Sequence, residues 1–324
     1  MPRLRRSRPD LPGISRKGAG RGFRYLTPDG AAVTDQETLE RVCSLAIPSA
    51  WRDVWIAPGA TEHIQAIGTD AAGRRQYLYH PQWRAARDLE KFDRALALAA
   101  RLPAARRLVT RDLRRPGLTQ ARVLAAAFRL LDRGCLRVGN EEYAAAYGSF
   151  GLATLRVRHV SLVGAGVIRL RFPAKSRQTW TSEIEDAELC AALAPLLERP
   201  RTGRLFAWQD EDGRWRPISA DLINADVGRR TGLDATAKDF RTLCGTVVAA
   251  TELAAQGPQA SEAARTRVIA LAMRAAAKEL GNTPAVARAS YVDPRVVEAF
   301  RRDEVIEQRP RLSAEAALRA LLMS

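Results

Sequence analysis

Tyr291 and Arg288 are two side chains that could do chemistry together, because they lie three residues apart in the segment GNTPAVARASYVDP (residues 281–294). Residues with this spacing are neighbours on a helix surface. An isolated phenol has a pKa of about 10, and nearby guanidinium groups favour the phenolate, which is the nucleophilic form. The same pair is also compatible with an ordinary boundary tyrosine that has a packed ring and a hydrated hydroxyl group.

A short helix is expected to carry this tyrosine. Gly281-Asn282 is typical of the end of the alanine- and leucine-rich helix before it, Thr283 can cap the next helix, and Pro284 suits its first position. Asp293-Pro294 would end this helix and start another. Helical periodicity predicts one buried face, made of Ala285, Val286, Ala289 and Val292. Tyr291 falls on the other side.

Three further stretches place single basic residues at positions of interest. Arg137 is expected at a helix end before a Gly-Asn turn, and Lys175 at the tip of the hairpin PAKSRQ. Arg241 lies near the start of an otherwise apolar helix, AKDFRTLCGTVVAA. Each residue by itself is typical of a solvated or ion-paired side chain.

The charge of the chain favours a polyanionic partner, most often nucleic acid. Lys and Arg number 52 against 36 Asp and Glu, which gives a net charge of +16. No uninterrupted apolar run is long enough for a transmembrane helix, and the N-terminus lacks an apolar signal-peptide core, so a cytoplasmic protein is expected. The four cysteines are widely scattered without a CxxC motif, which argues against a disulfide framework or a zinc site and fits a reducing cytoplasm.

Composition and periodicity predict an α+β chain in three parts. Residues 1–22 are basic and rich in Pro and Gly, and are expected to form a disordered tail. Residues 23–88 read as a β-rich lobe. Residues 89–324 are mostly helical, with a small three-stranded sheet near 160–184, where Ile168, Leu170 and Phe172 alternate with arginines.

In their order and spacing, these stretches resemble the type IB DNA topoisomerases, and most closely their compact bacterial and poxvirus-like branch. The resemblance runs from about Gly22 to Asp303. It is carried by GRRQYLYH (73–80), LRVGNEEY (136–143) with GLATLRVRHV (151–160), KDFRT (238–242) and LGNTPAVARASYV (280–292).

The resemblance implies a role for each candidate residue. Tyr291 matches the nucleophile, which forms a 3′-phosphotyrosyl bond, and Arg137 and Arg241 match the arginines that hold the non-bridging phosphate oxygens. Lys175 matches the general acid for the 5′-hydroxyl leaving group. Asn282 stands where many members have a histidine; its amide can still donate a hydrogen bond to phosphate but adds no positive charge. No metal, cofactor or ATP is implied, and no Walker motif is present.

The resemblance also implies a binding mode. The expected partner is double-stranded DNA of the nucleoid, bound by a monomer. The β-rich lobe and a catalytic domain of the tyrosine recombinase and type IB topoisomerase type would form a C-shaped clamp. In the lobe, the predicted DNA contacts are Arg75, Gln76, Tyr77 and Tyr79. Strand alternation places Gln76 with Leu78 on the face opposite to the other three.

Two alternatives remain open from the sequence. A tyrosine site-specific recombinase would share the same chemistry, although its usual HxxR box reads Lys238-Asp239-Phe240-Arg241 here and its N-terminal domain is usually helical. A basic DNA-binding protein without chemistry would show salt-dependent binding and no covalent adduct.

Overall fold

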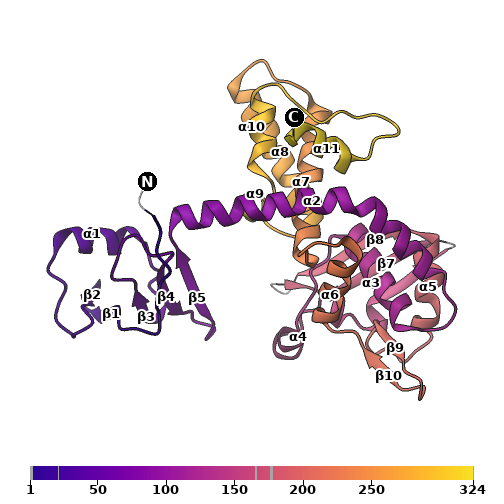
Figure 1. The fold of residues 1–324 in the computed structure, drawn as a ribbon, viewed down its shortest axis with the longest axis horizontal. Helices are drawn as coiled ribbons and strands as arrows, with labels where there is room; N and C mark the ends of the chain where they lie inside the picture. The colour runs from indigo at the N-terminus through magenta and orange to yellow at the C-terminus, as the bar shows by residue number, and fades with distance from the viewer. Residues whose placement is uncertain (1–2, 21, 165, 176–177, 324) are drawn as a thin grey trace. The chain divides into compact units, whose positions relative to one another are not determined.

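The computed structural model describes residues 3–20, 22–164, 166–175 and 178–323, in an α+β arrangement of two units. The units comprise residues 1–90 and 91–324, whereas the sequence pattern changes at residues 88–89. The long helix α2 (Pro81–Leu113) begins in the first unit and continues into the second (Figure 1).

The first unit is built on an antiparallel five-stranded sheet with the order β2-β1-β3-β4-β5. The strands are β1 (Ile14–Ala19), β2 (Gly22–Leu26), β3 (Arg52–Ile56), β4 (Ile64–Thr69) and β5 (Arg75–Tyr79). Helix α1 (Gln36–Ser44) begins after Asp35, whose carboxylate accepts from the Thr38 amide. Its Val42 packs with Ile14 and Ile56 in a small apolar core.

The N-terminal segment differs from the disordered tail predicted for residues 1–22. Strand β1 pairs with β2 on one side and β3 on the other. The Arg5 amide donates to the Thr61 carbonyl oxygen (2.9 Å), and the His63 amide donates to the Arg5 oxygen (3.0 Å). Backbone pairing needs few apolar side chains, and Ile14 alone supplies an anchor in the core, so the polar composition of the segment was misleading.

The second unit is mainly helical around one large apolar core. Its helices after α2 are α3 (Gln120–Gly134), α4 (Glu141–Tyr147), α5 (Ala187–Leu197), α6 (Ala220–Thr231), α7 (Ala237–Gln256), α8 (Glu262–Leu280), α9 (Pro284–Ser290), α10 (Pro294–Arg301) and α11 (Ala314–Met323). Two single 3₁₀ turns, Leu152–Thr154 and Val157–His159, follow α4.

The predicted three-stranded sheet is present in this unit. Strands β6 (Val160–Val163), β7 (Val167–Pro173) and β8 (Thr179–Glu185) pair in sequence order. In β7, Ile168, Leu170 and Phe172 are buried, while Arg169 and Arg171 are exposed, so the predicted alternation is confirmed. A two-stranded hairpin, β9 (Ala207–Gln209) with β10 (Trp215–Pro217), was not predicted because its strands are too short to establish a period.

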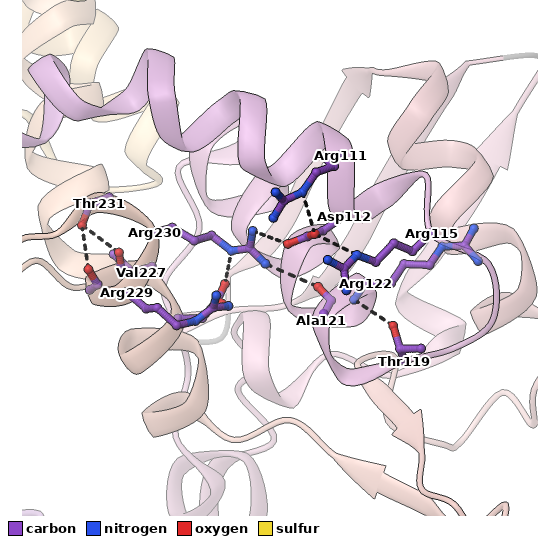
Figure 2. A network of polar contacts seen from close by, with 12 residues as sticks. Arg111, Asp112, Arg115, Thr119, Ala121, Arg122, Val227, Arg229, Arg230 and Thr231 are labelled. Atoms are coloured by element: carbon purple, nitrogen blue, oxygen red, sulfur yellow. Dashed lines mark hydrogen bonds and ion pairs between the residues drawn. The ribbon is translucent and has the colours of Figure 1, made fainter.

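A buried ion network joins α2 to α6 (Figure 2). The Arg230 guanidinium is 2.8 Å from the Asp112 carboxylate and 2.6 Å from that of Asp226, and Arg230 is only 5% exposed. Arg230 also donates to the Ala121 oxygen of α3 (3.4 Å). The network therefore fixes α6, the helix that leads directly into α7 and Arg241.

Candidate active site

The loop after α3 positions Arg137. Helix α3 ends at Cys135, which has a left-handed backbone conformation with φ 48°. The Leu152 amide then donates to the Arg137 oxygen (2.8 Å). Gly139 and Gly151 touch each other, and a Cβ atom on Gly151 would lie 2.6 Å from the Cα of Gly139. Only glycine fits this contact, so the glycines of the GN and GLAT motifs serve to fold the arginine loop.

Arg241 lies near the start of α7 and is 2% exposed. One terminal nitrogen donates to the Cys135 oxygen and the other to the Leu280 oxygen (2.8 Å). Within the described residues no carboxylate pairs with Arg241 or with Arg137. Burial, followed by repulsion from Arg137, lowers the pKa of Arg241 to about 10, so its guanidinium stays charged at neutral pH.

Tyr291 follows the last turn of α9 and is half-buried. The Cζ atom of Arg241 lies 5.0 Å from the centre of its ring. Helix α7 also holds the tyrosine backbone, because the Thr246 hydroxyl donates to the Tyr291 oxygen (3.1 Å). A Cβ atom on Gly245 would lie 3.0 Å from that oxygen, so glycine allows the close approach. One helix therefore places both Arg241 and Tyr291.

The caps predicted for this region are confirmed, but of the four residues predicted for the buried face only Val292 is buried. Gly281, Thr283 and Asp293 are the capping residues. However, Ala287 is the buried residue of α9, while Ala285, Val286 and Ala289 are exposed. The helix ends at Ser290, so a helical wheel extended to Tyr291 and Val292 does not apply. Arg288 is exposed, and the arginine beside the phenol is Arg241.

Asn282 connects this tyrosine segment to the Arg137 loop. An Arg137 nitrogen donates to the Oδ1 atom of Asn282 and, at 3.5 Å, to the Gly281 oxygen. This contact orients the amide so that its Nδ2 group is buried without a hydrogen-bond partner among the described residues. An unpaired buried donor costs free energy unless something binds it. The Asn282 N–H is therefore free to donate a hydrogen bond to a ligand oxygen.

The charges around Tyr291 change its acidity. Burial raises the pKa of the phenol, but the positive charges of Arg241, Arg137 and Lys238 more than offset it, so the pKa lies below its ordinary value of 10.0. A lowered pKa increases the fraction of phenolate near neutral pH. The group of two guanidiniums, one amide N–H and this phenol suits attack on a phosphodiester whose oxygens carry negative charge.

Lys175 lies at the exposed end of the β7–β8 hairpin. The Ala174 amide donates to the Gln178 oxygen (2.7 Å), which closes the hairpin around Lys175, and residues 176–177 of PAKSRQ lie outside the described residues. In the part of the chain that the structure describes, no contact joins the Lys175 ammonium group to the arginine–tyrosine group. Near the hairpin tip, β8 does contact the segment that carries Asn282, since a Cβ on Gly281 would lie 2.7 Å from the Trp180 ring.

In the first unit, β5 presents Arg75, Tyr77 and Tyr79 on one exposed face. The two tyrosine rings stack at 6.1 Å, and the Arg75 guanidinium lies 6.0 Å from the Tyr77 ring. Gln76 lies on the other face, where its amide donates to Asp70 (2.9 Å). The predicted alternation is therefore confirmed, and the structure does not bring Gln76 together with the other three residues.

The expectation of four separate cysteines is wrong for two of them. Cys135 and Cys244 form a disulfide across 109 residues of sequence. Their distance along the chain hid the pair, because α3 and α7 become neighbours only in the tertiary structure. The carboxylate of Glu279 lies near both, with the ligand atoms of the three residues within 4.8 Å of one another. In the disulfide, neither sulfur is available as a thiolate ligand for a metal.

Several residues that build the site were missed from the sequence. They are Lys238, Gly245, Thr246, Trp180 and the Cys135–Cys244 pair. In the sequence, Lys238 was interpreted only as a departure from HxxR. Its position three residues before Arg241 could have indicated that it lies on the same side of the helix as Arg241. The small residues of the CGT sequence after KDFRT also indicate a close helix contact.

Within the described residues, no helix is long and apolar enough to cross a membrane.

Two family models match the chain: the catalytic core of eukaryotic DNA topoisomerase I over residues 80–311, and the N-terminal domain of bacterial DNA topoisomerase IB over residues 22–70. A relative named DNA topoisomerase 1B, from Acanthamoeba polyphaga mimivirus, is 31% identical over 289 residues, which cover 87% of this chain and 85% of the relative.

These matches cover both units, and the N-terminal match favours a topoisomerase over a tyrosine recombinase or a basic protein without chemistry. The chain therefore belongs to the type IB DNA topoisomerases.

Proposed function

We propose that Tyr291 is the nucleophile with which this topoisomerase cleaves one strand of duplex DNA. The phenolate attacks the scissile phosphate, and a 3′-phosphotyrosyl bond forms as the bond to the 5′ oxygen breaks. One observation carries the proposal: two guanidiniums and an amide N–H converge beside a phenol with a lowered pKa, and among the described residues the guanidiniums have no carboxylate partner and the N–H has no acceptor.

Arg137, Arg241 and Asn282 act on the phosphate itself. The arginines bind its non-bridging oxygens, and their charge stabilises the additional negative charge of the transition state. Asn282 adds a neutral hydrogen bond through Nδ2. Both arginines are held by backbone carbonyls or Asn282 rather than by carboxylates, so their charge remains available to the substrate.

Lys175 supplies the proton for the leaving group. The 5′-alkoxide is a poor leaving group, so a positioned acid at the hairpin tip lowers the barrier. Religation is the reverse reaction: the 5′-hydroxyl attacks the phosphotyrosyl bond and releases Tyr291. The covalent bond conserves the phosphodiester energy, so supercoils relax by swivelling of the cut strand without ATP or a metal ion.

The remaining parts of the proposal concern DNA binding. Arg75, Tyr77 and Tyr79 contact DNA through one face of β5, and Gln76 does so only if it leaves Asp70. The enzyme acts as a monomer on nucleoid DNA, and its two units clamp the duplex. The second unit, residues 91–324, has the fold of the tyrosine recombinase and type IB topoisomerase catalytic domains. Sedimentation of the enzyme bound to a short duplex measures this stoichiometry; two or more chains per duplex would contradict it.

Relaxation of supercoiled plasmid in EDTA and without ATP tests the chemistry. The wild type is expected to relax both positive and negative supercoils. Tyr291→Phe removes only the hydroxyl oxygen, so it should bind DNA normally and lose cleavage by at least about 10⁴-fold. A denatured reaction with end-labelled DNA should show a covalent adduct for the wild type alone.

The outcomes separate the parts of the proposal. Relaxation by both proteins would mean that Tyr291 is not the nucleophile. Activity that needs added Mg²⁺ or ATP would contradict the metal-independent mechanism. Normal adduct formation by Lys175→Ala with a natural 5′ oxygen leaving group would remove Lys175 from the acid role.

A further inference from the structure

The Cys135–Cys244 disulfide lies between the two elements that carry the phosphate-binding arginines. Cys135 is two residues before Arg137, at the end of α3. Cys244 is three residues after Arg241, one turn further along α7. The two Cα atoms are 6.3 Å apart. The disulfide therefore sets the distance between the backbones from which Arg137 and Arg241 extend.

A hydrogen bond runs parallel to this covalent link. Arg241 donates to the backbone oxygen of Cys135, so the disulfide and the guanidinium both join α7 to the same residue. Cys135 itself has a positive φ, which is rare for a residue with a side chain, and the surrounding contacts must hold it. Movement of Cys135 would shift Arg137 and remove one of the partners of Arg241.

The charges of the two arginines oppose this arrangement. Arg137 and Arg241 repel each other, and the repulsion contributes to the lowered pKa of Arg241. Within the described chain no carboxylate lies between them to neutralise it, so the two elements are pushed apart until a phosphate binds. A covalent link across the gap resists that separation.

The disulfide can be reached from solvent. Cys244 is only half-buried, and both cysteines line a cavity of about 190 Å³ together with Glu279, Asp132 and Glu315. A small dithiol can therefore approach the sulfur of Cys244, which a fully enclosed disulfide would not allow.

We propose that Cys135–Cys244 is a reversible disulfide that controls the positioning of Arg137 and Arg241, with the oxidised enzyme as the fast form. Reduction proceeds by thiol–disulfide exchange: a dithiol thiolate attacks Cys244 Sγ, Cys135 leaves as a thiolate and takes a proton, and the second dithiol sulfur displaces Cys244. Two electrons pass to the protein, and the dithiol becomes a cyclic disulfide. This inference rests on the arginine roles given under the proposed function.

The test measures single-turnover cleavage with saturating duplex DNA, well below the melting temperature, before and after treatment with dithiothreitol. EDTA is present so that no metal ion bridges the free thiols with Glu279. Mass spectrometry after alkylation records the state of each cysteine. Reduction is expected to slow cleavage about three- to tenfold, because misplacement of a reacting group by less than an ångström costs about this much. Reoxidation should restore the rate.

Two variants make the test specific. Cys135→Ser/Cys244→Ser should cleave at the rate of the reduced wild type and ignore dithiothreitol. Cys43→Ser, which removes the exposed free cysteine, should keep the full response. In a Tyr291→Phe background, reduction should weaken non-covalent DNA binding, and this readout does not depend on the nucleophile.

Three results would overturn the inference: an unchanged rate with a reduced disulfide, a disulfide that resists reduction in the folded enzyme, or free thiols at both positions in the oxidised preparation. Absence of cleavage in both redox states, with DNA binding that still responds to dithiothreitol, would instead contradict the proposed nucleophile and retain the redox control.

Discussion

Two buried arginines of the second unit have opposite surroundings. Arg230 lies between the carboxylates of Asp112 and Asp226, and three of its nitrogens have partners (Figure 2). Arg241 is equally buried, yet backbone carbonyl oxygens accept its terminal N–H groups, and in the described part of the chain no carboxylate pairs with it and its Nε atom has no partner. The charged group with the largest effect on the pKa of Arg241 is another cation, Arg137.

The difference separates an arginine whose charge is neutralised within the fold from one that, under the proposed function, binds the substrate. Arg230 joins α2 to α6, and its positive charge is balanced by the carboxylates of Asp112 and Asp226, so it does not attract an anionic ligand. Arg241 is held in place by dipoles that do not cancel its charge, which costs stability before substrate arrives. In the proposed mechanism, a phosphodiester supplies the compensating negative charge, which its two non-bridging oxygens share. The unpaired amide of Asn282 fits the same account.

The largest expected effect is on stability, from Arg230→Gln. The change leaves Asp112 paired with Arg111 and Arg115 alone, and Asp226 with Arg229 alone, and these three arginines are largely exposed. The free energy of unfolding should therefore fall by up to about 3–5 kcal/mol, the cost of removing one partner from a buried ion pair. Cleavage per folded molecule should stay close to that of the wild type. Chemical denaturation and an active-site titration measure the two quantities.

The pH dependence provides a control for this variant. Burial raises the pKa of Asp112, but the positive charge of Arg230 outweighs it, so the pKa lies below its ordinary value of 3.8. The ion pair between Arg230 and Asp112 therefore stabilises the folded protein fully above pH 3.8, and this stabilisation is lost as the pH falls through the lowered pKa. The loss in free energy of unfolding caused by Arg230→Gln should become smaller as the pH falls, because the carboxyl groups of Asp112 and Asp226 no longer repel each other once they are protonated. A deficit independent of pH would indicate a packing defect instead of lost charge pairing.

Arg241→Gln should show the reverse pattern. Cleavage is expected to fall by about 10²–10³-fold, because a charged donor to the transition state is lost. The free energy of unfolding should change by no more than about 1 kcal/mol, since removal of a buried, repelled charge offsets the unpaired carbonyl that remains. Single-turnover cleavage and thermal melting measure both; a loss of stability as large as that of Arg230→Gln would erase the distinction between the two arginines.

Asn282 extends the comparison to a neutral hydrogen-bond donor, for which a smaller loss of cleavage is expected than for the charged Arg241. Asn282→Ala removes a neutral donor to a charged oxygen, which is worth about 1.5–3 kcal/mol, so cleavage should fall by about 10- to 100-fold. Asn282→His restores a donor and can add charge, and should cleave at least as fast as the wild type. A marked loss with histidine would show that asparagine is not an interchangeable donor in this site.

The smallest expected effect is a shift in the pH profile. The second-order rate of cleavage should rise with pH as Tyr291 ionises, and the rise should lie below pH 10.0 because the pKa of the phenol is lowered. Lys238→Gln removes one of the charges that lower the phenol pKa, so the rising part should move to higher pH. An unmoved profile with weaker DNA binding would assign Lys238 to the DNA backbone alone.

The sequence by itself determined the family and much of the local structure. The order and spacing of GRRQYLYH, LRVGNEEY, KDFRT and LGNTPAVARASYV were enough to indicate a type IB topoisomerase, and the family models match the same chain. The caps at Gly281, Thr283 and Asp293 and the alternation in β7 were also predictable, since neighbouring residues decide them.

Only the tertiary structure decided what depends on contacts between distant segments. The pairing of β1 with β3, the burial of Ala287 instead of Val286, and the Cys135–Cys244 disulfide all follow from which elements become neighbours. The same holds for the two arginines: Arg230 and Arg241 both stand in helices, and sequence cannot tell that one meets two carboxylates and the other none. Charge compensation is a property of the folded surroundings, and it separates the arginine that holds the fold from the one that we propose binds phosphate.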